Sequence, residues 1–220
     1  MMYPTHTARY VFILATLALA FLFGPHELVA QQSTTNDDSS PNWAIAIHGG
    51  AGGNPRSWSD KAREARRAGM EEALAIGKKI LGEGGTSLDA VESVIRFLED
   101  NAAFYAGRGG GLTTDVIVEM DASIMDGETR QCGAIASVKR VKNPITLARR
   151  VMTETKHVLL VAEGANRFAG DQKVPLVPPE YFLSYHAPHR DQHADEEIHY
   201  GTVGCVALDT HGPLAAGTST

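Results

Sequence analysis

Apolar residues recur at spacings of three and four along two neighbouring segments of the chain. In 60–81 these positions carry mostly small residues, and in 88–98 they carry Leu, Val and Ile. This period predicts two amphipathic helices. The glycine-rich run 82–85 ends the first helix, and Thr86 with Asp89 forms a capping box for the second. The small residues predict that the first helix packs closely on a neighbour.

Other segments carry the patterns of strands. We predict a strand at 44–47, a buried strand at 158–162, and at 203–208 a strand covered on both faces, because this run has no polar side. Residues 119–125 alternate and reach Asp126-Gly127, a hairpin signal followed by a strand at 130–138. Asn143 and Pro144 begin a helix that runs to about residue 153, and 163–168 is a short helix. This order predicts an α/β fold, a sheet sandwich flanked by helices.

Composition sets broad limits on this protein. The chain has 220 residues, of which 43% are hydrophobic, enough for one domain with a sizeable core. Its net charge of -6 argues against nucleic acid as a partner, since phosphate neutralisation needs a clustered basic face. Arg108 before three glycines is a single Arg-Gly step, far short of an RNA-binding repeat.

The N-terminal segment has the layout of a secretion signal. A basic start is followed by an apolar run at 11–23 and by Ala30 at the expected cut. We therefore predict a signal peptide at 1–30, a disordered linker at 31–42, and a secreted or periplasmic protein with no stable membrane span after cleavage. The alternative is an uncleaved anchor. No cysteine follows the apolar run, so no lipid attachment is expected.

The cysteines and histidines allow two further interpretations. Cys132 and Cys205 could form a disulfide in an exported protein, but both fall in apolar runs expected to be core strands, which favours two free thiols. The stretch 175–200 is rich in Pro, His and acidic residues. A metal site is one interpretation, but the spacings fit no zinc template, and a solvated loop explains them as well. The histidines concerned are His186, His189, His193 and His199.

Thr202 stands at the boundary between that polar stretch and the apolar strand at 203–208. A threonine hydroxyl becomes a nucleophile when a base is in reach, and its own α-amine supplies one once the preceding bond is cut. The amine has an unperturbed pKa of about 8, so it is partly neutral near pH 7. Gly201 leaves that bond open to attack by the Thr202 hydroxyl. The alternative is that Gly-Thr is an ordinary strand start.

A second glycine-rich segment follows the strand at 44–47. His48 precedes four glycines in five positions, so the backbone must bend sharply or approach another group closely. A dinucleotide fingerprint and a phosphate loop are both absent. A lipase-type oxyanion loop is also excluded as an interpretation, because the chain has no Gly-x-Ser-x-Gly elbow.

These motifs together resemble one family. The run 201–220 resembles the nucleophile region of the plant-type L-asparaginase and isoaspartyl peptidase family, and 43–53, 104–109, 120–127 and 143–168 match it upstream in the same order. Its members are N-terminal nucleophile hydrolases with an αββα sandwich. The resemblance implies a Thr202 nucleophile and a Gly201-Thr202 autocleavage site. It also implies a second catalytic threonine, Thr220, whose hydroxyl forms a hydrogen bond with the nucleophile. It also implies a loop beside the nucleophile at His48, Gly49 and Gly50.

By the same resemblance the chain is a self-processing amidohydrolase for L-asparagine or β-aspartyl dipeptides, both small molecules. Residues 43–201 would form the first subunit and 202–220 the start of the second. The family continues well beyond this point, so we expect a truncated second subunit, an incomplete sandwich, and, in a complete protein, a dimer of two-chain units. One alternative is a glycosylasparaginase, although Gly201 before the threonine argues against it. The other is an inactive secreted fragment of such an enzyme.

The segment 98–108 matches a family loop that binds sodium through main-chain carbonyls, and no other cofactor is required. The implied ligands are the carbonyls of Leu98, Glu99, Asn101, Phe104, Ala106 and Arg108. The chain departs from the family at Tyr105, where an asparagine usually orients the nucleophilic threonine. A tyrosine can donate one hydrogen bond there, but it is much larger.

Overall fold

A six-stranded sheet forms the centre of the described part of the chain, in the order β1-β5-β6-β2-β3-β4. The computed structural model describes residues 42–50, 56, 58–186 and 201–220. All neighbouring strands are antiparallel except β3 and β4, which are parallel. The strands are β1 (Ala44–His48), β2 (Met120–Asp126), β3 (Cys132–Val138), β4 (Leu159–Val161), β5 (Val203–Leu208) and β6 (Leu214–Ser219).

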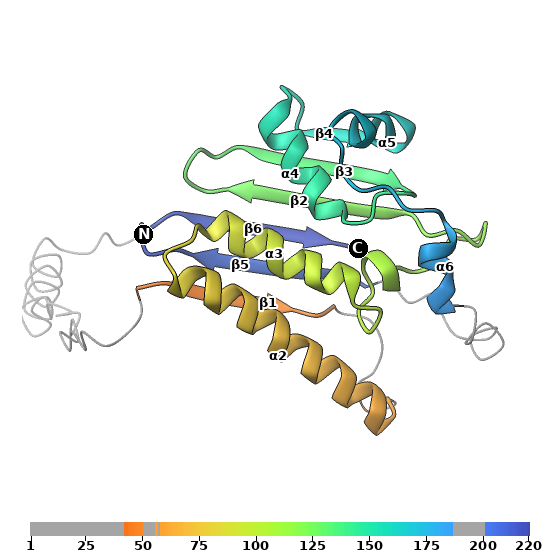
Figure 1. Ribbon diagram of the computed structural model, residues 1–220, viewed down its shortest axis with the longest axis horizontal. Helices are drawn as coiled ribbons and strands as arrows, with labels where there is room; N and C mark the ends of the chain where they lie inside the picture. The colour runs from red at the N-terminus through yellow and green to blue at the C-terminus, as the bar shows by residue number, and fades with distance from the viewer. Residues whose placement is uncertain (1–41, 51–55, 57, 187–200) are drawn as a thin grey trace, which may run out of the picture. The chain divides into compact units, whose positions relative to one another are not determined.

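Three helices lie across one face of this sheet, as Figure 1 shows. They are α2 (Asp60–Gly82), α3 (Ser87–Asp100) and α4 (Pro144–Glu154). Helix α2 packs on α3 and on β1, α3 packs on β5 and β6, and α4 packs on β2 and β3. Shorter elements follow at the edges: η1 (Gly107–Gly109), α5 (Ala162–Asp171) and α6 (Glu180–His186). The described residues therefore form one sheet with one helical layer, which corresponds to half of an αββα sandwich.

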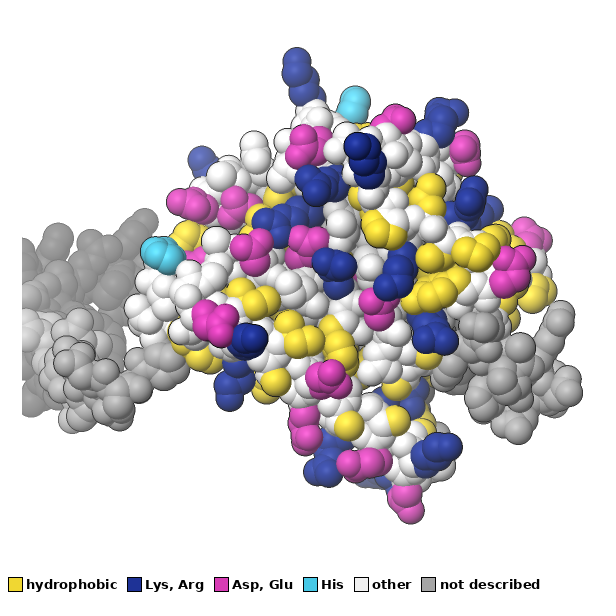
Figure 2. Space-filling view, viewed as in Figure 1, with side chains coloured by type: hydrophobic (Ala, Val, Ile, Leu, Met, Phe, Trp, Pro, Cys, Tyr) yellow, Lys and Arg dark blue, Asp and Glu magenta, His cyan; other side chains and the backbone are white. Residues whose placement is uncertain are grey.

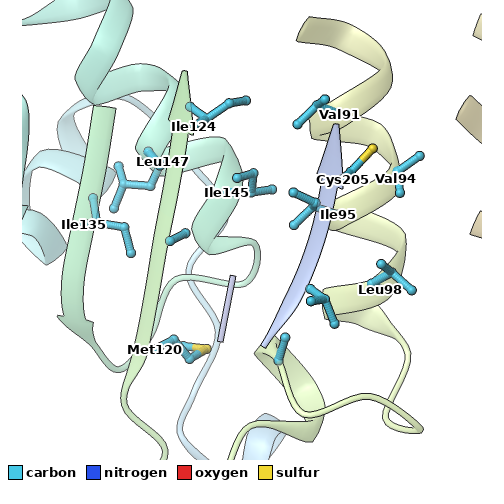
Figure 3. Packing of buried hydrophobic residues seen from close by; sticks show 14 of the residues in the cluster. Val91, Val94, Ile95, Leu98, Met120, Ile124, Ile135, Ile145, Leu147 and Cys205 are labelled. Carbon is cyan, nitrogen blue, oxygen red and sulfur yellow. The ribbon is translucent and has the colours of Figure 1, made fainter. Parts of the chain in front are cut away.

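The core lies between this helical layer and the sheet. Figure 3 shows Ile95 of α3 near Cys205 of β5, and Ile145 of α4 in the same layer. Gly217 of β6 lets both helices approach, since a Cβ there would lie 2.9 Å from Ile95 Cδ1 of α3 and 3.3 Å from Ile145 Cδ1 of α4. Burial of these side chains supplies most of the force that holds α3 and α4 on the sheet.

Both predicted amphipathic helices are confirmed. The Thr86 hydroxyl accepts a hydrogen bond from Asp89 N at 3.1 Å, as a capping residue should. The small residues Gly69, Ala73 and Gly77 form the buried side of α2, and a Cβ on Gly77 would lie 3.0 Å from Val94 Cγ2 of α3. The close packing predicted for the first helix is therefore present.

The prediction that 203–208 is covered on both faces is wrong. Val206 is 48% exposed, and Leu214 of β6 and Met125 of β2 are 58% and 44% exposed on the same side of the sheet. The described helices that pack on these strands lie on the other face. We call this side of the sheet, on which Val206, Leu214 and Met125 lie, the open face.

Three other expectations need correction. The strand at 158–162 is not buried: β4 lies at the sheet edge, and Leu159 and Val161 are each 51% exposed. Cys132 is half-buried at the start of β3 rather than in the core. Helix α6 was not expected, because its sequence follows two prolines in a stretch that has the composition of a loop.

The thiols of Cys132 and Cys205 are both free, as expected. Burial raises the pKa of the Cys205 thiol to about 12. Figure 2 shows acidic and basic side chains interspersed over the helical side of the molecule. Within the described ranges, no helix is long and apolar enough to cross a membrane.

Candidate active site

The two predicted threonines meet at one end of the β5–β6 hairpin. Register pairs Val203 with Ser219, so Thr202 and Thr220 lie just beyond the paired ends of adjacent strands. The Thr220 N–H donates to Asp121 O of β2 at 2.9 Å, and the Thr220 hydroxyl donates to Gly201 O at 2.7 Å. The carbonyl before Thr202 therefore already carries a hydroxyl donor, and strand alternation places Thr202 and Thr220 toward the open face.

The glycine loop after β1 lies beside these threonines. His48 pairs with Gly204, and a Cβ on Gly204 would lie 2.8 Å from His48 Cδ2, so the imidazole covers a strand position that has no side chain. Gly50 has φ of +110°, and a Cβ there would lie 3.4 Å from Thr202 O. Gly49 packs closely against the Phe104 ring, since a Cβ added to Gly49 would lie 2.7 Å from Phe104 Cε1. The loop backbone thus passes within contact distance of Thr202.

Tyr105 covers the other side of Gly201. A Cβ on Gly201 would collide with Tyr105 Cβ and would lie 2.8 Å from Tyr105 Cγ, so residue 201 must be glycine in this arrangement. Gly201 itself is buried. The Tyr105 side chain therefore packs directly against the backbone of Gly201.

A buried carboxyl group lies behind the threonine end of the hairpin. Glu99 is 0% exposed, and its Oε1 accepts hydrogen bonds from Ser219 Oγ at 2.7 Å and from Ile145 N at 2.9 Å. Its Oε2 has no hydrogen-bond partner in the part of the chain that the structure describes. Burial raises the pKa of Glu99 to about 8, although the bonds from Ser219 and Ile145 oppose that shift. The carboxyl group therefore keeps its proton to a higher pH than an ordinary glutamate does.

Sequence reasoning assigned only the carbonyl of Glu99 and overlooked its side chain. The available signal was an acidic residue directly after Leu98, at the end of an apolar helical stripe. Because the side chain bonds to Ser219, the neighbour of Thr220, it supports the strand end that carries the second threonine.

The six predicted sodium ligands lie along the end of α3 and the turns up to η1. Three of their carbonyls already accept backbone hydrogen bonds: Leu98 O from Asn101 N, Asn101 O from Phe104 N, and Ala106 O from Gly109 N. The Cα atoms of Gly107 and Gly109 lie against other carbonyls of the loop, since a Cβ on Gly107 would be 2.5 Å from Glu99 O. A carbonyl oxygen has a second lone pair, so these hydrogen bonds leave the carbonyls able to bind a hard cation.

The interpretation of the histidine-rich stretch 175–200 as a metal site has no support in the described residues. No group of three or more His, Cys, Asp or Glu side chains suited to a metal ion occurs in the ranges that the structure covers. His189, His193 and His199 and the side chain of His186 fall outside those ranges. The signal peptide at 1–30 and nearly all of the linker at 31–42 also lie outside the described residues.

The half-sandwich, with a Gly-Thr pair opening a central strand and a glycine loop against it, corresponds to half of the αββα fold of the N-terminal nucleophile class. The chain belongs to the asparaginase family, since residues 41–220 match the family model described as Asparaginase. It is 42% identical over 188 residues to the isoaspartyl peptidase/L-asparaginase of Macaca fascicularis, covering 81% of this chain and 60% of that protein.

Relatives from other organisms give the same picture. The isoaspartyl peptidase/L-asparaginase of Danio rerio is 40% identical over 185 residues, which covers 80% of this chain and 58% of that protein. The probable isoaspartyl peptidase/L-asparaginase 2 of Arabidopsis thaliana is 38% identical over 211 residues, 81% of this chain and 65% of the relative. The chain thus spans about 60% of the length of the curated relatives that it matches.

Proposed function

We propose that this protein is a self-processing amidohydrolase that cuts its own Gly201–Thr202 bond and then uses Thr202 as the nucleophile. The observation that carries the proposal is the hydrogen bond of 2.7 Å from the Thr220 hydroxyl to Gly201 O. Attack on a carbonyl places negative charge on its oxygen, and a donor aimed at that oxygen stabilises the charge. The structure holds such a donor on the one carbonyl that Thr202 must attack.

Self-cleavage then proceeds as an acyl shift followed by hydrolysis. The Thr202 Oγ attacks the Gly201 carbonyl carbon, its proton passes to the peptide nitrogen, and the C–N bond breaks as an ester forms. Water hydrolyses that ester, which releases a Gly201 carboxylate and restores the Thr202 hydroxyl beside its new α-amine. The free amine is the base that the second reaction requires.

The substrates follow from the names of the relatives, isoaspartyl peptidase and L-asparaginase. Thr202 would attack the side-chain carbonyl of L-asparagine, or the β-aspartyl carbonyl of an isoaspartyl dipeptide, and release ammonia or the second amino acid. The resulting β-aspartyl ester of Thr202 would be hydrolysed by water to aspartate. Thr220 would donate to the developing oxyanion or to Thr202 in this step.

Three further features belong to the same proposal. Carbonyls of the 98–108 loop would hold a structural sodium ion, which supports the turn that carries Tyr105. The complete protein would assemble as a dimer of two-chain units. The apolar run at 11–23 supports export to the periplasm or the outside of the cell.

Intact mass spectrometry of the full gene product tests the central claim. Incubation near neutral pH for several days should yield two fragments, the second beginning at Thr202, and Thr202→Ala should remain a single chain. Ammonia release from L-asparagine and amino acid release from a β-aspartyl dipeptide should rise in step with cleavage. A wild-type chain that stays intact would contradict the proposal.

A further inference from the structure

Three side chains from separate segments stack beside the scissile bond. The Arg66 guanidinium of α2 lies 4.1 Å from the ring centroid of Trp58 and 5.7 Å from the ring centroid of Tyr105. Both distances fall within the range of cation–π attraction. Arg66 is half-buried, which reduces its hydration and strengthens these contacts relative to a fully exposed pair. We call Trp58, Arg66 and Tyr105 the aromatic–arginine stack.

Each outer member of the stack is fixed by its own neighbours. Trp58 O accepts a hydrogen bond from Arg63 Nη1 at 2.6 Å, and the next residue, Ser59, caps α2 by accepting from Ala62 N at 3.2 Å. On the other side, Phe104 is 2% exposed and fills the space left by Gly49 and Gly69. The backbone that carries Tyr105 is therefore held in place by a buried neighbour.

The stack ends on the residue that is cut. The Tyr105 side chain packs on the Cα of Gly201, while the Thr220 hydroxyl bonds to the Gly201 carbonyl oxygen. Gly201 is thus held at two atoms by two independent parts of the fold. Attack by Thr202 requires its Oγ to approach the Gly201 carbonyl carbon from one face of the peptide plane, and a displacement of about 1 Å can cost on the order of a hundredfold in rate.

We propose that the aromatic–arginine stack is a positioning device for self-cleavage, in which Arg66 fixes the Tyr105 ring and the ring fixes Gly201. The inference rests on the proposed self-processing function and assigns the start of α2 a role in it. Arg66 and Trp58 touch no reacting atom, so they act only through Tyr105.

The rate of fragment formation in the full gene product tests this inference. Tyr105→Phe keeps the ring face and should cleave faster than Tyr105→Leu. Arg66→Met and Tyr105→Leu keep bulk but remove the cation or the ring face, and each should slow cleavage by about 5- to 30-fold. Arg66→Lys retains a cation and should fall between. The double variant Arg66→Met/Tyr105→Leu should be no slower than the slower single variant.

Matched controls separate positioning from general stability. Arg67→Met removes the neighbouring arginine, whose partner is the exposed Glu64, and should leave the rate unchanged. Each substitution, placed in the uncleavable Thr202→Ala background, should leave the thermal midpoint within about 2 °C of that background. Rates that simply follow these midpoints would indicate a structural role and overturn the inference.

The remaining outcomes are distinct. Arg66→Met cleaving at the wild-type rate, or losses that multiply in the double variant, would overturn the positioning role while the proposed function stands. A wild-type chain that never cleaves would overturn both.

Discussion

Helix α3 is tied to the β5–β6 hairpin at both ends by a buried carboxyl group, and the two groups differ in charge. At its N-terminus, Asp209 accepts from Ser87 N at 2.8 Å and from His211 N at 2.9 Å. Burial alone would raise the pKa of Asp209, but these hydrogen bonds lower it by more. The pKa of Asp209 therefore lies below its ordinary value. At the other end, Glu99 has an oxygen without a partner among the described residues and a raised pKa.

The surroundings explain the difference. Asp209 receives the Ser87 N–H at the start of α3, where the helix dipole favours negative charge. Glu99 lies in the last turn of the same helix, where the dipole disfavours negative charge. Its Oε1 accepts from Ile145 N and the Ser219 hydroxyl, and the neighbouring Asp100 is a like charge that adds to the rise in pKa. The fully satisfied group lies far from the threonines, and the costly one lies directly behind them. Perturbed groups concentrate at functional sites in this way.

The largest effect should come from Glu99→Ala. The change leaves Ser219 Oγ and Ile145 N without their acceptor and opens a cavity, so the free energy of unfolding should fall by about 3–4 kcal/mol. Glu99→Gln keeps an acceptor oxygen and should cost only about 1 kcal/mol at pH 6. Urea unfolding in the Thr202→Ala background measures both, and equal losses for the two variants would refute a neutral, bonded Glu99.

The stability that Glu99 contributes and the stability that Asp209 contributes should depend on pH in opposite directions. The contribution of Glu99 is fully present below about pH 4.5 and is lost as the pH rises toward about 8, because the folded state binds the proton more tightly. Between pH 5 and pH 9 at constant sodium, the loss should be on the order of 3 kcal/mol. Glu99→Gln should lack this loss and become more stable than wild type at pH 9. Parallel curves would refute the raised pKa.

Asp209 should behave in the opposite sense. Its contribution is present above its ordinary pKa near 3.8 and is lost as the pH falls through the lowered folded value. At pH 7 we expect Asp209→Ala to cost about 2 kcal/mol, because Ser87 N loses its acceptor at a helix start. Denaturation with guanidinium compares it with Asp126→Ala, whose side chain bonds only within an exposed turn. The two variants being equally stable would show that the Asp209 contact is not a specific anchor.

The smallest effect concerns thiol reactivity between these two ends. Cys205 is buried under α3 with a raised pKa and should react with iodoacetamide at least about tenfold more slowly than the half-buried Cys132. Glu99→Ala should accelerate only the Cys205 reaction, since loosening α3 uncovers that thiol. Peptide mass mapping at timed intervals gives both rates. Acceleration at Cys132 alone would place the disturbance elsewhere.

The sequence predicted most of this fold because each element has a local signal. Periodicity marked α2 and α3, the Thr86 capping box marked a helix start, and Asp126-Gly127 marked the β2–β3 hairpin. Burial could not be read in the same way, because an apolar run has the same composition whether one face or two are covered. Val206 and Leu159 were therefore expected to be buried, and both are about half exposed.

The candidate site was predictable only in part. The Gly201-Thr202 pair and the glycine loop have recognisable motifs, so their residues could be named in advance. The bond from Glu99 to Ser219 joins residues far apart in the chain, and the stacking of Arg66 on Tyr105 depends on how α2 lies against the loop at 104–105. Neither contact leaves a trace in local spacing.

The strand order has one more consequence. β5 and β6 follow the proposed cleavage site, the Gly201–Thr202 bond, in sequence, yet they lie between β1 and β2, which precede it. Cleavage before Thr202 would therefore produce two polypeptides that share one sheet. The β5–β6 hairpin of the second polypeptide would pair with β1 of the first on one side and with β2 of the first on the other. Separating them means breaking two full ladders at once, and rejoining them becomes a bimolecular search. After cleavage, the stability of the protein would thus be kinetic: it would be set by the rate at which the two polypeptides unfold and separate.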